Sequence, residues 1–111
     1  MTTMKLVVLT VVFFLTAVES AIAGHSRPKL TPQVVSFWKG VAQCETGQNW
    51  KGLGSTYQGG LGFYWATWNW WAGELGLLDK YPDAGDAPPL VQIEVAQYGR
   101  VVYSGYWGCI S

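Results

Sequence analysis

The chain has 111 residues, of which half are hydrophobic, 15% are aromatic and only 13% are charged. Seven basic and seven acidic side chains give a formal net charge of zero, which argues against nucleic acid as a partner because its recognition needs a basic patch. The single histidine, His25, lies in a short polar segment, so we expect no metal site and no cofactor.

Residues 1–23 have the pattern of an export signal. Lys5 provides a positive charge before an apolar run at 6–18, and Ala21 and Ala23 form the small-x-small pattern that precedes cleavage. The run is shorter than the roughly 20 residues of a membrane-spanning helix, although an uncleaved anchor is the alternative interpretation. The predicted organisation is a signal peptide at 1–23, a polar leader at 24–31 and one domain at 32–111.

The chain contains two cysteines, Cys44 and Cys109. In an exported protein an even number of cysteines favours a disulfide over a metal site or a redox pair. A domain of this size is near the lower limit of what folds alone, and such domains often need a cross-link. Closing so long a loop stabilises the fold by roughly 4 kcal/mol in the chain-entropy treatment.

A helix is predicted over residues 32–45. Thr31 followed by Pro32 is typical of a helix start, because the hydroxyl caps the first turn and proline fits the first helical position. Gly47 is a natural left-handed C-cap. One apolar stripe of this helix, at the spacing i, i+3, i+4 and i+7, consists of Trp38, Val41, Ala42 and Glu45.

Glu45 is a candidate catalytic residue because it continues this apolar stripe. It lies in the last turn of the predicted helix, where the backbone dipole disfavours a negative charge, and burial would act in the same direction. A carboxyl group that stays protonated near neutral pH is what general-acid catalysis requires. A surface glutamate at a frayed helix end is the alternative interpretation.

The segment "KGLGSTYQGGLGF" at residues 51–63 contains five glycines, which excludes a long helix. Gly59 and Gly60, between Tyr57 and Phe63, predict a small β-hairpin or a tight turn beside a groove. The segment lacks the spacing of a phosphate-binding loop, so a nucleotide site is not expected.

Two further helices are predicted after this segment. The second covers residues 65–72 and ends at Gly73, and the third begins at residue 86 or 87, after a loop, and runs to about Tyr103. We expect its buried face to contain Ile93, Ala96 and Val101. The chain is therefore predicted to form a small α+β domain that is mainly helical with a minor β-hairpin.

Tryptophan is unusually frequent, with seven residues in the chain and four of them in "WATWNWW" at 65–71. On a helix, Trp65, Trp68 and Trp71 share one side and Trp70 points away. Core packing is the simpler interpretation for any single tryptophan. So many rings in a neutral domain also favour a sugar-binding groove, because sugars stack their CH-rich faces on aromatic rings.

The motifs "WKGVAQCETGQNW" and "YQGGLGFYWATW", followed by "QIEVA" and "GYWGC" near the end, resemble those of the resuscitation-promoting factors. These are transglycosylase-like, lysozyme-related cell-wall domains of actinobacteria and their phages. The resemblance covers residues 37–109. It implies a lysozyme-like fold with a disulfide between Cys44 and Cys109, and Glu45 as the catalytic acid.

The resemblance also points to residues that contact the substrate. Thr67 matches a groove threonine of the family, and Asn49 and Trp50 match the pair that closes the first motif. With the neighbouring aromatic side chains included, the predicted substrate-binding residues are Trp50, Tyr57, Tyr64, Trp65, Thr67 and Trp68.

Four positions depart from the family pattern. Gly62 stands where a glutamine is usual, and Tyr64 where an acidic residue is frequent. Gln48 replaces a glycine of the first motif, and Ser104 replaces a glutamine near the end. These changes remove polar contacts to the substrate and retain the acid, so they affect substrate preference first.

The chemistry implied by the resemblance is cleavage of the β-1,4 bond between N-acetylmuramic acid and N-acetylglucosamine in peptidoglycan, a glycoside hydrolase or lytic transglycosylase reaction. Glu45 would protonate the bridging oxygen, and the sugar would pass through an oxocarbenium-like state. The predicted hairpin contains no carboxylate that could act as a second catalytic group beside Glu45. This favours single-acid chemistry that leaves a 1,6-anhydro end. Plain hydrolysis remains open.

The predicted protein is thus a secreted, extracellular and cell-wall-associated monomer that acts in growth or resuscitation. Its partners would be peptidoglycan glycan strands and a peptidoglycan endopeptidase. The alternatives are a non-catalytic peptidoglycan-binding module or a virion-associated structural protein with the same fold.

Overall fold

The computed structural model describes residues 26–110. The predicted signal peptide at 1–23 and the start of the polar leader lie outside this range. The elements are α2 (Pro32–Thr46), β1 (Tyr57–Gln58), β2 (Phe63–Tyr64), α3 (Trp65–Glu74), the 3-10 turn η1 (Ala84–Asp86) and α4 (Pro89–Tyr103). The fold is α+β and mainly helical, as predicted. No helix in this part of the chain is long and apolar enough to cross a membrane.

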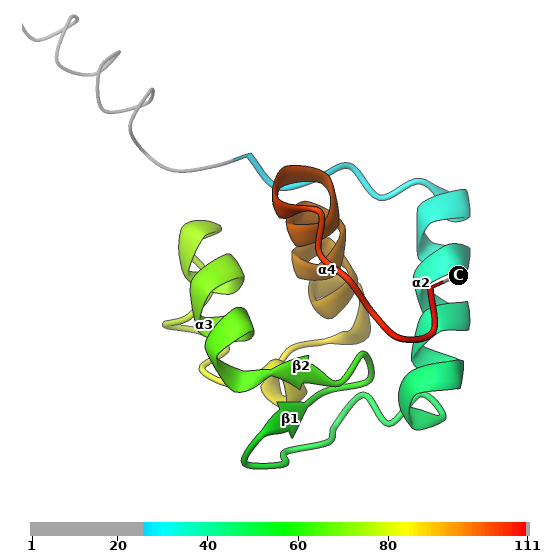
Figure 1. The fold of residues 1–111 in the computed structure, drawn as a ribbon. Coiled ribbons are helices and arrows are strands. Elements are labelled where there is room, and N and C mark those ends of the chain that lie inside the picture. Colours follow the sequence, from blue (N-terminus) through cyan, green and yellow to red (C-terminus); the bar gives the residue numbers. More distant parts are fainter. Residues whose placement is uncertain (1–25, 111) are drawn as a thin grey trace, which may run out of the picture.

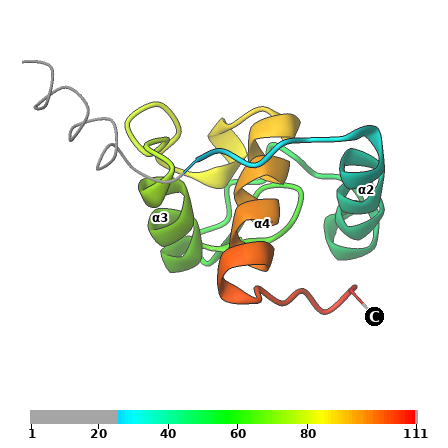
Figure 2. The same ribbon diagram turned by 90° about the horizontal axis from the view of Figure 1, so that it is seen from above.

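Helix α4 lies between α2 and α3, and both ribbon views show this arrangement (Figures 1 and 2). The antiparallel hairpin of β1 and β2 pairs Tyr57 with Tyr64 and Gln58 with Phe63. It lies beside the lower ends of the helices in Figure 1. After α4 the chain, which we call the C-terminal tail (residues 104–110), crosses from α4 back to α2.

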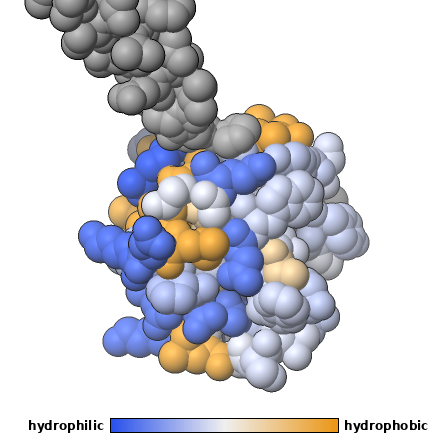
Figure 3. Space-filling view, turned by 90° about the vertical axis from the view of Figure 1, so that its left-hand side faces the viewer, coloured by the Kyte–Doolittle hydropathy of each residue, from blue (hydrophilic) through white to orange (hydrophobic). Residues whose placement is uncertain are grey.

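The side of the molecule on which α3 lies is divided by polarity (Figure 3). Strongly hydrophilic residues, with a few hydrophobic patches among them, gather over one half of this face, and residues of intermediate hydropathy, the class of tryptophan and tyrosine, cover most of the other half. The longest uncharged stretch of the sequence has a similar character, because no Lys, Arg, Asp or Glu occurs between Gly52 and Gly73. This stretch includes the hairpin and most of α3.

Helix α2 begins and ends as its local sequence predicts. The Thr31 hydroxyl accepts a hydrogen bond from the Val34 N–H at 3.2 Å, and Pro32 occupies the first turn. Gly47 adopts the left-handed conformation with φ of 66°, and its N–H donates to the Gln43 carbonyl. The helix extends one residue beyond the prediction, to Thr46.

The predicted limits of the other two helices need correction. Helix α3 does not end at Gly73 but continues to Glu74, and Gly76, with φ of 72°, is the glycine that turns the chain. Helix α4 does not begin at residue 86 or 87, because the residue before a proline disfavours the helical conformation. Ala87, which precedes Pro88, is accordingly extended, with φ of −87° and ψ of 145°.

The predicted buried face of α4 is right for Ile93 and Ala96 and wrong for Val101. The first two are fully buried, whereas Val101 is 70% exposed. Eight residues turn an α-helix by about 80° beyond two full turns, so Val101 lies well off the line of Ile93. The side chain of Gln92 lies on the buried face in its place.

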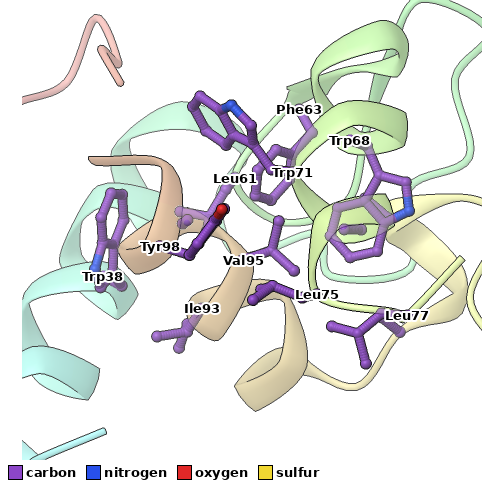
Figure 4. Packing of buried hydrophobic residues seen from close by; sticks show 14 of the residues in the cluster. Trp38, Leu61, Phe63, Trp68, Trp71, Leu75, Leu77, Ile93, Val95 and Tyr98 are labelled. Atoms are coloured by element: carbon purple, nitrogen blue, oxygen red, sulfur yellow. The ribbon is translucent and has the colours of Figure 1, made fainter. Parts of the chain in front are cut away.

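The core combines aromatic and aliphatic side chains, several of which Figure 4 shows in contact, and Trp107 of the C-terminal tail belongs to it. Trp38 of α2 meets Trp107 of the tail edge to face at 4.8 Å, and Phe63 of the hairpin contacts both Trp68 and Trp107. Such edge-to-face pairs stabilise a core beyond the effect of the area that they bury. Side chains from all parts of the domain therefore meet in one cluster.

Helix α3 packs unusually close to α4 because of Gly99. A Cβ atom at this position would lie 2.1 Å from Cε3 of Trp71, which is far inside van der Waals contact. The indole of Trp71 therefore rests directly on the backbone of α4, where only glycine leaves room for it.

Two tyrosines fasten the end of α4 to the end of α3. The hydroxyls of Tyr98 and Tyr103 both donate to Oε1 of Glu74, at 2.7 and 2.5 Å. Burial, together with the bond to Glu74, raises the pKa of the Tyr98 phenol, and the bond to Glu74 raises the pKa of Tyr103. Both groups therefore remain protonated donors in neutral solution. Because Tyr103 is the last residue of α4, its bond to Glu74 fixes the position from which the tail begins.

Gln92 is a fully buried amide that connects three segments. Its Oε1 accepts from the Gly60 N–H at 2.9 Å, and its Nε2 donates to the carbonyls of Trp50 and Ala87 at 2.8 and 2.9 Å. A single side chain on α4 thus holds the hairpin turn, the loop after α2 and the approach to α4.

We predict that Gln92→Met lowers the free energy of unfolding by about 3 kcal/mol, because it leaves three buried polar partners unsatisfied at similar side-chain volume. Urea denaturation measures the change. Gln33→Met is the matched control, because this glutamine is exposed on α2. Equal midpoints for the two variants would contradict the structural role of Gln92.

Candidate active site

A groove of about 230 Å³ is open between the end of α2, the hairpin, α3 and the C-terminal tail. Its walls are mainly aromatic. The lining residues are Glu45, Tyr57, Gly62, Phe63, Tyr64, Thr67, Trp71, Tyr106, Trp107 and Gly108.

Glu45 projects into this groove from the last turn of α2 and is half-buried. Its Oε1 accepts a hydrogen bond from the backbone N–H of Cys109 at 2.9 Å. The described residues offer no hydrogen bond to Oε2. One carboxyl oxygen is therefore held by the tail, and the other is available to a ligand in the groove.

The predicted disulfide between Cys44 and Cys109 is present, with the two Cα atoms 5.9 Å apart. Cys44 directly precedes Glu45, and Cys109 carries the N–H that binds the Glu45 carboxyl. The covalent bond and the hydrogen bond therefore join the same two places in the chain. They fix the tail against the end of α2 and set the direction of the acid.

Thr46, the next residue, positions the opposite wall of the groove. Its hydroxyl donates to the Gly60 carbonyl at 2.6 Å and accepts from the Asn49 N–H at 3.0 Å. The indole N–H of Trp107 donates to the Leu61 carbonyl at 3.0 Å. The hairpin turn is thus tied both to the helix that carries the acid and to the tail.

The structure brings together three of the six predicted substrate-binding residues. Tyr57, Tyr64 and Thr67 line the groove with Glu45. Trp65 is adjacent to Tyr64, with ring centroids 5.8 Å apart, and lies just outside the lining residues. The other two have different locations.

Trp50 and Trp68 lie away from this groove. The ring of Trp50 packs against the backbone of Gly60 and faces a separate hollow that Lys51 and Asp86 also line. Trp68 is fully buried in the core, and its indole N–H donates to the Tyr81 carbonyl at 2.9 Å. Their side chains have structural contacts in this fold.

Residues that were not among the predicted substrate-binding residues form the rest of the groove. Trp71 and Phe63 form part of the walls, and the tail contributes Tyr106, Trp107 and Gly108. For the tail residues, the only signal in the sequence was the motif "GYWGC", which indicates that the tail is part of the family pattern but not that it faces Glu45.

Gly62 explains one departure from the family pattern in physical terms. Its φ of 62° is in the left-handed region, which glycine adopts without strain. It lines the groove, and a Cβ atom there would lie 3.8 Å from Cγ2 of Thr46. The position beside the acid therefore contributes open space in place of a side chain.

Glu45 is the only charged residue among those that line the groove in the described part of the chain. Glu74 is occupied by two tyrosines, and Asp83 accepts from Gln58 and caps η1. A neutral, aromatic groove with one carboxyl group suits an uncharged substrate and proton transfer by a single acid.

A family model described as "Transglycosylase-like domain" matches residues 33–108. The chain belongs to the transglycosylase-like domain family. The match runs from the start of α2 to the tail and so contains every residue of the groove. Membership of this family supports a lysozyme-like enzyme that cleaves peptidoglycan. A search among curated proteins gives no match.

We predict that the transglycosylase-like domain loses about 4 kcal/mol of stability in the double variant Cys44→Ser/Cys109→Ser, because the cross-link closes a loop with a sequence separation of 65. Urea denaturation of the oxidised parent and the variant measures this loss. The reduced parent protein is the control, and it should unfold at the same urea concentration as the double variant. An unchanged midpoint in the variant would contradict the prediction.

Proposed function

We propose that this chain is an exported lytic transglycosylase that cleaves the β-1,4 bond between N-acetylmuramic acid and N-acetylglucosamine. The observation that carries the proposal is the position of Glu45, the one carboxylate among the described residues that line the aromatic groove of a transglycosylase-like domain. Its backbone hydrogen bond to Cys109 gives the acid a defined orientation.

In the first step, protonated Glu45 donates its proton to the bridging oxygen. The bond between this oxygen and C1 of the muramic acid residue breaks, and the N-acetylglucosamine end leaves as an alcohol. Positive charge develops on the ring oxygen and C1 of the remaining sugar. Glu45, now a carboxylate, lies on the side of the departing oxygen and faces this charge.

In the second step, the same carboxylate acts as a base. It removes the proton from the C6 hydroxyl of the muramic acid residue, and the C6 oxygen bonds to C1. The product is a 1,6-anhydro end, and Glu45 regains the proton that it gave up. One carboxyl group is sufficient for the cycle, which agrees with the absence of a second carboxylate among the described lining residues.

The walls of the groove supply contacts for a neutral sugar. The rings of Tyr57, Tyr64 and Tyr106 offer stacking surfaces, and Thr67 offers a hydroxyl that can donate to or accept from sugar hydroxyl and amide groups. The second candidate, a binding module without turnover, uses the same contacts. The two candidates differ only in whether Glu45 transfers a proton to the bound sugar.

Export is part of the proposal, because peptidoglycan lies outside the cytoplasm and the disulfide suits an oxidising compartment. The proposed enzyme is a monomer that opens glycan strands during growth or resuscitation. Its product keeps the peptide cross-links, so a peptidoglycan endopeptidase is the class of enzyme that would complement it.

Replacing Glu45 with glutamine is expected to lower the release of soluble fragments from purified, dye-labelled cell walls by about a hundredfold or more, since general-acid catalysis commonly contributes at least this factor. Asp79→Asn is the matched control, because it removes one exposed carboxylate outside the groove. Equal release by Glu45→Gln and the parent would show that the chain only binds the wall.

The products of the parent protein are expected to carry 1,6-anhydro-muramic acid ends. Mass spectrometry of the released muropeptides checks this, because an anhydro product is lighter than a hydrolysis product by one water molecule. Incorporation of ¹⁸O from labelled water provides the control, since only hydrolysis introduces it at C1. Reducing ends that carry the label would show a muramidase with the same acid.

A further inference from the structure

Three aromatic side chains form a continuous exposed surface next to the groove. Tyr57, Tyr64 and Trp65 are 65%, 44% and 46% exposed. The ring centroids of Tyr57 and Tyr64 are 6.1 Å apart, and those of Tyr64 and Trp65 are 5.8 Å apart. We call these three residues the aromatic ledge.

The backbone holds the ledge in place. Tyr57 and Tyr64 are direct partners in the antiparallel pair, so their side chains stand on the same face of the hairpin. The N–H of Trp65 donates to the Thr56 carbonyl at 3.0 Å, which fixes the first residue of α3 to the residue directly before β1. The ledge is therefore a pre-formed surface and not a set of independent side chains.

The ledge continues the groove away from the acid. Tyr57 and Tyr64 line the groove, and Trp65 follows beyond it. The other end of the hairpin, at Gly62, lies beside Thr46, the neighbour of Glu45. Tyr64 is two positions after Gly62, a distance of roughly 7 Å along a strand, so the ledge begins about one sugar ring further along a bound glycan.

The chemistry of the ledge favours a neutral sugar as its occupant. No Lys, Arg, Asp or Glu occurs between Gly52 and Gly73, so this stretch provides no charge for a phosphate, an anionic lipid or an ionised peptide. The rings are tilted to one another by 58° and 44°, so they present separate faces in place of one flat apolar sheet. Stacking on sugar CH groups makes use of such faces.

We propose that the aromatic ledge is an additional subsite that binds an N-acetylglucosamine-type sugar of the glycan strand, beyond the bond that is cleaved. This inference rests on the proposed function and extends it. A strand long enough to cover both the groove and Trp65 gains a stacking contact that a short fragment does not reach. The enzyme therefore prefers long glycan strands.

The test measures binding in the absence of turnover. The Glu45→Gln protein is titrated by calorimetry with peptide-free peptidoglycan strands that have been fractionated by length, and Trp65→Ala and Trp65→Phe are added to this background. We expect long strands to bind about tenfold more tightly than short ones. Trp65→Ala abolishes this gain, and Trp65→Phe, which keeps a ring, retains most of it.

Trp70→Ala is the matched control. Trp70 lies on the same helix and is 52% exposed, but it is five residues from Trp65 and its ring packs on Tyr103 at 4.4 Å. The control variant should keep the full length dependence. Thermal unfolding of each variant verifies that it is folded.

Two results would contradict the proposal that the aromatic ledge is a sugar-binding subsite. If short and long strands bind the Glu45→Gln protein equally, or if Trp65→Ala keeps the gain, the groove binds glycan without this subsite and the proposed cleavage still stands. If no strand binds and the parent protein releases nothing from cell walls, the proposed function fails together with the ledge.

Discussion

The site depends on the place where the C-terminal tail meets the end of α2. Cys109 is bonded to Cys44 and donates its backbone N–H to Glu45. The tail is also held by Trp107, whose ring packs in the core and whose indole N–H donates to the hairpin, and by the Gly105 N–H, which donates to Gly99. One wall of the groove and the direction of the acid are therefore set by the same residue, which is 64 positions away from Glu45.

The opposite wall is held by polar side chains and not by its own sheet. Each strand of the hairpin has two residues, and a hairpin of this size has little stability on its own. Its position comes from the hydroxyl of Thr46, the amide of Gln92 and the indole of Trp107. These three groups reach the turn from α2, α4 and the tail, so the hairpin is placed by the helical part of the domain.

Helix α2 is set by local signals, whereas the walls of the groove are held by long-range contacts, and this difference explains what the sequence could predict. The limits of α2 follow from local signals, Thr31, Pro32 and Gly47, and the structure has each of them in its expected role. Glu45 could be singled out because it is a carboxylate that continues an apolar stripe within a specific motif. In contrast, Tyr106 and Trp107 reach the groove only through the path of the tail after α4, and no periodicity in the sequence indicates that path.

The tryptophans show why a helical pattern alone could not separate core from surface. Trp65 and Trp68 are three residues apart and share a side of α3, yet Trp68 is buried and Trp65 is exposed. The difference is their position along the axis, because Trp65 is the first residue of the helix and extends past the packed core. The same geometry that removes Trp65 from the core places it at the end of the groove.

The composition of the groove also limits what the enzyme can recognise. The residues of the described chain that line the groove include no Lys or Arg. Walls without these cations cannot select the ionised carboxylates of a peptide stem. Recognition then falls to aromatic faces and neutral hydrogen bonds, and these identify the glycan strand itself.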